Sequence, residues 1–378
     1  MDFSFTEDQE ALRQLARKIF ADHCTHDRLK AVEATPEWFD RTLWAALAEA
    51  SLLGVALPED IGGSGLGFFE LCILLEEIGR AVAPLPAWPT LVLGALALDR
   101  FGSDAQRKRW LPGVIAGDTI LSAALAETGW DEPTTLATTT ARRDGGTWRL
   151  DGEKASVPAA HLAARILVPA RTADGKAGVF LVDPNGAGVG LERLVTTNGE
   201  PQFAVTLAGA TVGADDVLGD PAGGTAIVDW LLPRAITGLC AMSTGVADRA
   251  VRMTAEYTTS RKQFGKPLAT FQAVAQRAAD AFIWVEGMRW TMWQAAWRLS
   301  EGQSAPEDVA VAKYWAGEGG HFATYAAQHL HGGIGLDVDY PLHRYFLWSK
   351  QLELSLGSSV QHLARLGAAM AAAPPIER

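Results

Sequence analysis

Hydrophobic positions recur at helical spacing through the first third of the chain. Thr6 and Gln9 have the spacing of a capping box, which predicts that the first helix starts directly after Thr6. Further amphipathic runs cover about residues 36–53 and 68–82. This pattern predicts a helical N-terminal region.

The pattern changes near Leu121, where short β-like runs replace the helical spacing. Asp144-Gly145-Gly146 and Asp151-Gly152 are typical of hairpin turns. Strands are predicted over residues 164–171, 179–182 and 203–207. The middle of the chain is therefore expected to form a compact β domain.

Helical spacing returns after Gly224. Four long helices are predicted, over residues 231–258, 273–299, 309–330 and 348–372, and such a set is typical of a bundle. The expected fold class is mostly α with a central β domain. We place the N-terminal helical domain at residues 1–119, the middle β domain at 120–222 and the four-helix bundle at 223–378.

Composition narrows the class of protein. The chain has 378 residues, of which 48% are hydrophobic and 20% charged, as in soluble globular proteins. A net charge of −11 argues against nonspecific nucleic-acid binding. No apolar run approaches the roughly 20 residues that span a bilayer, so no membrane is expected as a partner. Cys24, Cys72 and Cys240 have neither disulfide nor metal spacing, and a cytoplasmic location is expected.

Five segments, in this order and at this spacing, resemble the acyl-CoA dehydrogenase family over nearly the whole chain. They are Phe5–Gln9, Leu57–Gly65 leading into Leu75–Arg80, Asp151–Lys154, Arg261–Pro267 and His331–Gly335. The resemblance implies a helical N-terminal domain, a β-barrel and a C-terminal four-helix bundle, with FAD as the cofactor. It also implies α,β-dehydrogenation of an acyl-CoA thioester, in which a carboxylate removes the α proton.

The resemblance predicts no catalytic base in this chain. Counting forward from the glycine turn, the position of the family's usual glutamate is Leu356. Some members place the base before an arginine early in the bundle, and the matching residue here is Pro233. Glu353, about one turn before Leu356, is the candidate for a displaced base. Our preferred interpretation of Glu353 is an exposed carboxylate on a helix.

The family's β domain holds the flavin ring through two segments that are altered here. The first contains Trp130-Asp131-Glu132, where the family has small residues, and so places bulk and negative charge where FAD would lie. The second contains Ser156-Val157-Pro158 where the family has Trp-Ile-Thr, and a proline supplies no backbone donor. We therefore expect this β domain not to hold FAD by itself.

The family's bundle contacts the FAD of a neighbouring subunit, and these elements are retained. The matching residues are Arg261, Phe264, Gln272, His329, Gly332 and Gly333. Arginine suits a pyrophosphate because its fork is planar and charged. Glycine lets the backbone approach phosphate oxygens. His329 departs from the family, which has glutamine there.

Loss of one half of the site and retention of the other predicts a heteromeric enzyme. This chain would complete the FAD site of a homologous, base-bearing subunit that acts on an acyl-CoA and passes electrons to an electron-transfer flavoprotein or a similar acceptor. The sequence is similar to base-less subunits of actinobacterial heterotetramers that dehydrogenate sterol side-chain CoA thioesters. The alternatives are a self-sufficient homotetramer using Glu353, a flavin enzyme of different chemistry such as a monooxygenase, and a scaffold or regulatory binding protein.

Overall fold

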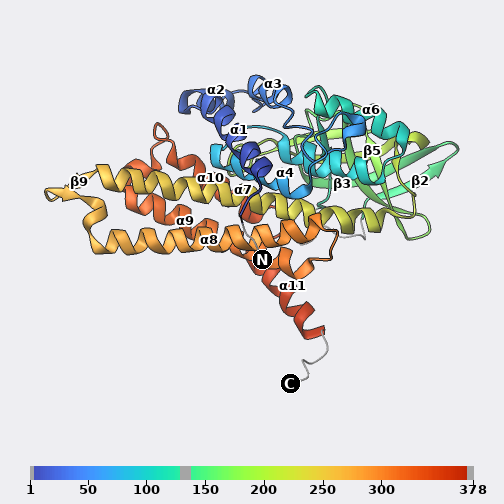
Figure 1. The fold of residues 1–378 in the computed structure, drawn as a ribbon. Coiled ribbons are helices and arrows are strands. Elements are labelled where there is room, and N and C mark those ends of the chain that lie inside the picture. The colour runs from blue at the N-terminus through green and yellow to red at the C-terminus, as the bar shows by residue number, and fades with distance from the viewer. Residues whose placement is uncertain (1–3, 128–137, 373–378) are drawn as a thin grey trace. The chain divides into compact units, whose positions relative to one another are not determined.

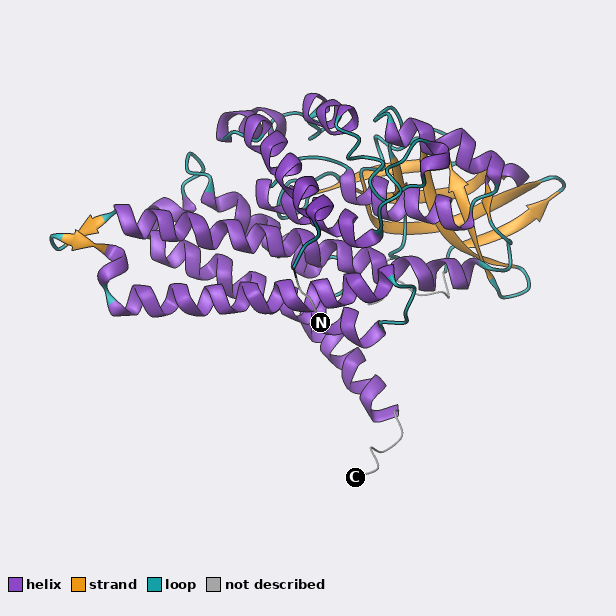
Figure 2. Cartoon of the chain, in the orientation of Figure 1, coloured by secondary structure: helices purple, strands orange, loops and turns teal. Residues whose placement is uncertain are grey.

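The structure, a computed structural model, describes residues 4–127 and 138–372 (Figure 1). It divides into two compact units. The helical unit comprises Met1–His26, Cys72–Ala83 and Ile236–Arg378, and the mixed unit comprises Asp27–Leu71 and Pro84–Ala235. Helices, then strands, then helices follow one another along the chain (Figure 2), which confirms the predicted fold class. The boundaries of the three predicted domains stay a prediction.

The N-terminal helices begin where local side chains favour them. The first helix, α1, is Glu7–His23, and its capping box is formed: Thr6 Oγ1 accepts from the Gln9 backbone N–H at 3.2 Å and Gln9 Oε1 accepts from that of Thr6 at 3.0 Å. Helix α4, Phe68–Ala81, follows the predicted run. Both helices are specified by short-range pattern and capping.

The helix predicted over about residues 36–53 is shorter than expected. It is α3, Arg41–Glu49, because the Asp40 carboxylate accepts from the backbone N–H groups of Thr42 and Leu43, each at 3.1 Å, and so starts the helix there. The other elements of this region are α2 (His26–Glu33), the 3-10 turn η1 (Glu59–Ile61), the π-helix η2 (Trp88–Ala95), α5 (Leu96–Phe101) and α6 (Asp104–Ile115).

The β domain is one eight-stranded sheet in which seven strands follow the order β6-β7-β3-β2-β4-β5-β8, and β1 pairs in parallel with β4. The strands are β1 (Leu121–Ala123), β2 (Thr140–Asp144), β3 (Thr147–Pro158), β4 (Arg165–Thr172), β5 (Ala177–Val182), β6 (Val189–Leu194), β7 (Gln202–Gly213) and β8 (Val217–Leu218). The described residues of the β domain form an apolar core that includes Leu150, Val157, Ile166 and Phe180.

One of the two predicted hairpin turns is present. Asp144 pairs with Thr147, so the turn through Gly145 and Gly146 joins β2 to β3 as expected. The turn predicted at Asp151-Gly152 is wrong, because both residues lie inside β3 and pair with β7. The register shifts there, between Leu150 and Asp151, and Gly152 has a φ of 148°. A bulge within a strand therefore accounts for the glycine.

The C-terminal helices are α7 (Gly224–Ser260), α8 (Gln272–Ser300), α9 (Pro306–His331), α10 (Leu342–Leu354) and α11 (Ser359–Ala372). Of these, α7, α8, α9 and α10 run alongside one another in Figure 1, and α11 points away from them. The first three agree with the prediction. The helix predicted over residues 348–372 is wrong, because Leu356 and Gly357 adopt left-handed φ values of 55° and 100° and separate α10 from α11.

Helix α7 is long and apolar enough to cross a bilayer by its length and composition. Its most apolar window has a mean hydropathy of 1.2, but 61% of that window is buried inside the protein. A buried core helix meets the same criterion, so α7 is weak evidence for a membrane span.

Candidate functional site

All six predicted cofactor-binding residues lie at or beyond helix ends. Arg261 follows α7, and its backbone N–H donates to the Tyr257 carbonyl at 2.8 Å. A short hairpin comes next, formed by β9 (Lys262–Gln263) and β10 (Lys266–Pro267), and Figure 1 shows β9 at the far end of the bundle helices. Gln272 is the first residue of α8. Gly332 and Gly333 follow α9, and His329 is in its last turn.

The hairpin presents an aromatic ring outward. Phe264 is 92% exposed and has a φ of 52°, a strained value for a residue with a side chain. Its ring meets that of Phe271 edge-on at a centroid distance of 6.2 Å. Lys266 Nζ lies 4.4 Å from the centre of the Phe271 ring. The hairpin therefore combines an exposed aromatic face with nearby cations.

The glycine turn after α9 is open to approach. Gly332 has a φ of 67° and a ψ of −145°, which favours glycine. Gly333 has no such requirement, and a side chain there would meet nothing within 4 Å. Packing within the chain therefore does not explain a glycine at position 333. An open backbone of this kind fits close contact with a phosphate-bearing ligand.

The structure brings these segments to one end of the bundle. The rings of Tyr257, near the end of α7, and His331, at the end of α9, stack at 4.3 Å. The residues beside them, Arg261 and Gly332, are exposed. Phe264, Gln272, His329 and Gly333 are exposed as well. The arrangement offers an arginine, an aromatic face and open backbone, a combination suited to a nucleotide.

The turn between α10 and α11 is held by buried polar groups. Lys313 Nζ donates to the carbonyls of Leu352 at 2.5 Å and Glu353 at 3.2 Å, and burial lowers the pKa of Lys313 to about 8. His362 Nε2 lies 3.0 Å from the Leu356 carbonyl. The sequence interpretation missed Lys313, whose place in α9 offered no signal of a contact with the end of α10.

Leu356 itself is half-buried in this turn and has no ionisable group. Glu353, on α10, is not the exposed carboxylate that we expected, because its side chain is only 19% exposed and accepts from Lys350 Nζ at 2.6 Å. Pro233 lies inside α7 and is followed by Arg234, whose guanidinium stacks 3.8 Å from the Trp230 ring centre. Of the three candidate positions for a base, Leu356, Pro233 and Glu353, only Glu353 has a side chain that could accept a proton.

The altered flavin segments of the β domain are only partly within the described residues. Trp130, Asp131 and Glu132 lie outside them. Ser156 is exposed, with a φ of 52°, at a register shift between β3 and β7. Val157 is fully buried in the sheet core, and the Pro158 carbonyl accepts from Ser122 Oγ at 2.5 Å. Val157 and Pro158 are thus accounted for by packing within the mixed unit.

Lys154, in one of the resembling segments, forms a buried ion pair with Glu127. Lys154 Nζ donates to Glu127 Oε1 at 2.5 Å, and the backbone N–H groups of Thr138 and Thr139 donate to the same carboxylate at 2.6 and 3.2 Å. Burial alone would raise the pKa of Glu127, but the charge of Lys154 and these donors lower it to about 2. The pair therefore holds residues 127 and 138–139 together.

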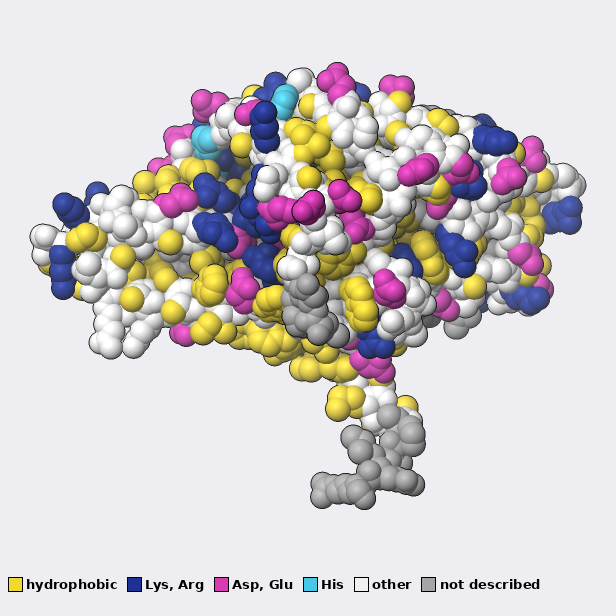
Figure 3. All heavy atoms as spheres, viewed as in Figure 1, with side chains coloured by type: hydrophobic (Ala, Val, Ile, Leu, Met, Phe, Trp, Pro, Cys, Tyr) yellow, Lys and Arg dark blue, Asp and Glu magenta, His cyan; other side chains and the backbone are white. Residues whose placement is uncertain are grey.

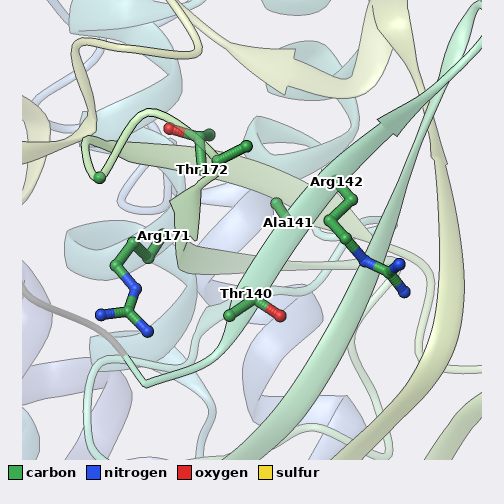
Figure 4. A pocket seen from close by; sticks show the side chains of 7 residues that line it. Thr140, Ala141, Arg142, Arg171 and Thr172 are labelled. Carbon is green, nitrogen blue, oxygen red and sulfur yellow. The ribbon is translucent and has the colours of Figure 1, made fainter.

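A shallow cavity of about 450 Å³ lies between β2 and β4. It is lined by Thr140, Ala141, Arg142, Arg171, Thr172, Ala173 and Gly175 (Figure 4). Arg171 and Arg142 point to opposite sides in this view. Arg142 also pairs with Asp151 at 3.2 Å. The two cations do not converge on a common ligand.

Comparison with known proteins covers nearly the whole chain. Family profiles described as the N-terminal, middle and C-terminal domains of acyl-CoA dehydrogenase match residues 6–118, 123–207 and 222–371. Acyl-CoA dehydrogenase FadE27 of Mycobacterium tuberculosis is 38% identical, over 99% of this chain and 100% of the relative.

Two solved structures are similar along their length. One is described as a Tcur3481-Tcur3483 steroid ACAD variant, with 47% identity, a TM-score of 0.90 and coverage of 97% of this chain and 98% of that one. The other is the ChsE4-ChsE5 complex from Mycobacterium tuberculosis, with 38% identity, a TM-score of 0.93 and coverage of 99% and 100%. The matches span every domain of the fold, and this chain is a member of the acyl-CoA dehydrogenase family.

Proposed function

We propose that this chain is the base-less subunit of a heteromeric, FAD-dependent acyl-CoA dehydrogenase. The observation that carries the proposal is the pairing of two features in the helical unit. The turn that would present the base is firmly held but displays Leu356. The end of the bundle that would meet a nucleotide keeps Arg261 and the open glycine turn, both exposed.

The residues at that end fit the cofactor. FAD supplies the hydride acceptor when it is bound. Arg261 would bind its pyrophosphate through a charged, bidentate fork, and the backbone at Gly332 and Gly333 would approach the phosphate oxygens. Gln272, at the start of the 29-residue helix α8, adds a helix N-terminus that favours negative charge. Phe264 offers a flat face for a ring of the nucleotide.

The partner proposed is a homologous subunit that carries the catalytic carboxylate and the flavin-ring contacts. One similar structure is described as the ChsE4-ChsE5 complex, and the other is described as a Tcur3481-Tcur3483 steroid ACAD variant. Both descriptions name two proteins, which supports a heteromer. The word steroid in the second supports a sterol side-chain CoA thioester as the substrate class. An electron-transfer flavoprotein or a similar acceptor would reoxidise the cofactor.

The test is flavin stoichiometry. The chain expressed alone is expected to purify without FAD, and its complex with a base-bearing homologue is expected to carry one FAD per heterodimer, measured from the flavin absorbance. Arg261→Ala should weaken FAD binding to the complex by about 10- to 100-fold, because charge-assisted hydrogen bonds contribute roughly 1.5–3 kcal/mol. A lone chain that binds FAD fully, and whose FAD an acyl-CoA reduces, would contradict the proposal.

A self-sufficient enzyme is the second candidate, favoured by the half-burial of Glu353 one turn before Leu356. It requires turnover by the lone chain, and Glu353→Gln should then abolish flavin reduction. The ion pair of Glu353 with Lys350 weighs against this candidate, because Lys350 Nζ already occupies one oxygen of the carboxylate.

A further inference from the structure

Three aromatic residues from distant parts of the sequence meet behind the glycine turn. His331 is 4% exposed and stacks on Tyr257 at 4.3 Å with 18° between the ring planes. Tyr340 lies 5.4 Å from His331 and 6.5 Å from Tyr257, at steeper angles. We call Tyr257, His331 and Tyr340 the aromatic stack.

Hydrogen bonds give the central ring of the stack a single orientation. His331 Nδ1 is 2.8 Å from the Ala327 carbonyl, which can only accept, so Nδ1 carries the proton. His331 Nε2 is then an acceptor, and the Tyr340 hydroxyl donates to it at 3.1 Å. Burial lowers the pKa of His331, which favours this neutral form.

Each member of the stack is tied to a segment of the proposed nucleotide site. The Tyr257 carbonyl accepts from the backbone N–H of Arg261 at 2.8 Å. His331 directly precedes Gly332. The Tyr340 backbone N–H donates to the Asp337 carbonyl at 3.1 Å, which closes the loop after the glycine turn. The stack therefore joins the end of α7, the end of α9 and the start of α10.

We propose that the aromatic stack is a positioning unit that sets the spacing between Arg261 and the Gly332-Gly333 turn, so that both reach one pyrophosphate. This inference rests on the proposed function, because it assigns a role to residues behind the same site. Tyr257, His331 and Tyr340 act through Arg261 and the glycine turn, and none is assigned a contact with the ligand.

The test uses the complex of this chain with a base-bearing homologue and FAD as the probe. Tyr340→Phe keeps the ring and removes only the hydroxyl that donates to His331. We expect the dissociation constant for FAD to rise about tenfold, the equivalent of one hydrogen bond. The unfolding midpoint of the lone chain should fall as well, because His331 Nε2 is left without its donor, so the change in FAD affinity is the deciding readout. A purely structural role would shift that midpoint and leave FAD affinity unchanged.

His331→Phe is the second variant, because it keeps stacking but removes both hydrogen bonds, and it should weaken FAD binding more than Tyr340→Phe. Tyr325→Phe is the matched control. Tyr325 is also on α9 and also stacks on a histidine, His321, at 5.9 Å, but it is 53% exposed. Its loss of a hydroxyl should leave FAD affinity unchanged.

Arg261→Ala separates the two proposals. If it leaves FAD affinity unchanged, the proposed function fails and the stack has no site to position. If Arg261→Ala weakens binding while Tyr340→Phe and His331→Phe stay within twofold of the unaltered complex, the inference about the stack is overturned and the proposed function stands. Should His331→Phe not fold, Tyr340→Phe decides the matter alone.

Discussion

Lys313 is the residue on which the turn after α10 most depends. It is 1% exposed, and its Nζ satisfies two carbonyls at the C-terminal end of α10 that have no partner within the helix. Such a cation complements the helix dipole as well as the open acceptors. These two contacts fix the end of α10 directly before the turn that carries Leu356.

Replacement of Lys313 by methionine should lower the free energy of unfolding by about 1–3 kcal/mol, because it leaves the Leu352 and Glu353 carbonyls buried without donors. Denaturant titration measures the change. Lys350→Met is the matched control: Lys350 is 25% exposed and pairs with Glu353, so its loss should cost less than about 1 kcal/mol. Equal effects of the two variants would show that burial of the donor is irrelevant.

At the level of elements, α4 and α7 approach so closely that only glycine fits at the crossing. A Cβ at Gly245 would collide with the Glu76 carbonyl, and one at Gly79 would collide with the Met242 carbonyl. These are backbone atoms, so no side-chain rotation relieves the collision. The two glycines therefore allow the helices to meet backbone to backbone.

Gly245→Ala should destabilise the chain by more than about 3 kcal/mol or prevent folding, because α4 and α7 must move apart. Thermal unfolding followed by circular dichroism measures this. Gly367→Ala, on α11, is the control, since a Cβ there meets nothing within 4 Å and alanine favours a helix by up to about 1 kcal/mol. A Gly245→Ala variant as stable as the unaltered chain would refute the close crossing.

The same helices share a buried ion network with α8. Asp248 on α7 pairs with Arg80, with Arg252 at 2.7 Å and with Arg289 of α8 at 2.9 Å. Arg289 also contacts Glu76 of α4. Burial alone would raise the pKa of Asp248, but the surrounding arginines lower it to about 2.

The lowered pKa of Asp248 predicts an acid-sensitive contribution to stability. The unfolded carboxyl titrates near 3.8 and the folded one near 2, so the contribution is complete above about pH 5 and falls as the pH drops from there to 2. It amounts to about 2 kcal/mol. Asp248→Asn should therefore lose much less stability at pH 2 than at pH 7. Asp144→Asn, at an exposed pair with Arg149, should show no such difference.

At the scale of the whole molecule, α8 carries an exposed apolar stripe. Ile283, Trp290 and Trp297 recur every seven residues and are 63%, 44% and 41% exposed. Figure 3 shows hydrophobic side chains gathered along the face over α8. Extended apolar surface of this kind is typical of a protein that associates, and it supports the proposed heteromer.

Ile283→Asp should therefore weaken association with the base-bearing subunit by at least about tenfold while the chain stays folded, because it places a charge in a desolvated interface. Sedimentation velocity of the mixed subunits gives the affinity. Val195→Asp, at a fully exposed loop residue of the mixed unit, is the control and should have no effect. An unchanged affinity for Ile283→Asp would place the partner elsewhere.

Local pattern was sufficient for most of the fold. Capping at Thr6 and the spacing of α4, α7, α8 and α9 were predictable, because a helix is specified by its own cap and apolar stripe. The prediction of a hairpin turn at Asp151-Gly152 was wrong because both residues pair with β7. The dipeptide, although typical of turns, lies at a bulge within β3. The break between α10 and α11 at Leu356 was missed because it lies within a helical run. The residues that hold it, Lys313 and His362, are on α9 and α11.

The sequence by itself determined the family and the order of the helical and β segments, because these depend on which residues stand at which positions. Only the tertiary structure decided that Lys313 holds the end of α10 and that Tyr257, His331 and Tyr340 meet behind the glycine turn. Contacts between residues far apart in the chain follow from how helices pack, and helix packing is not readable from local spacing.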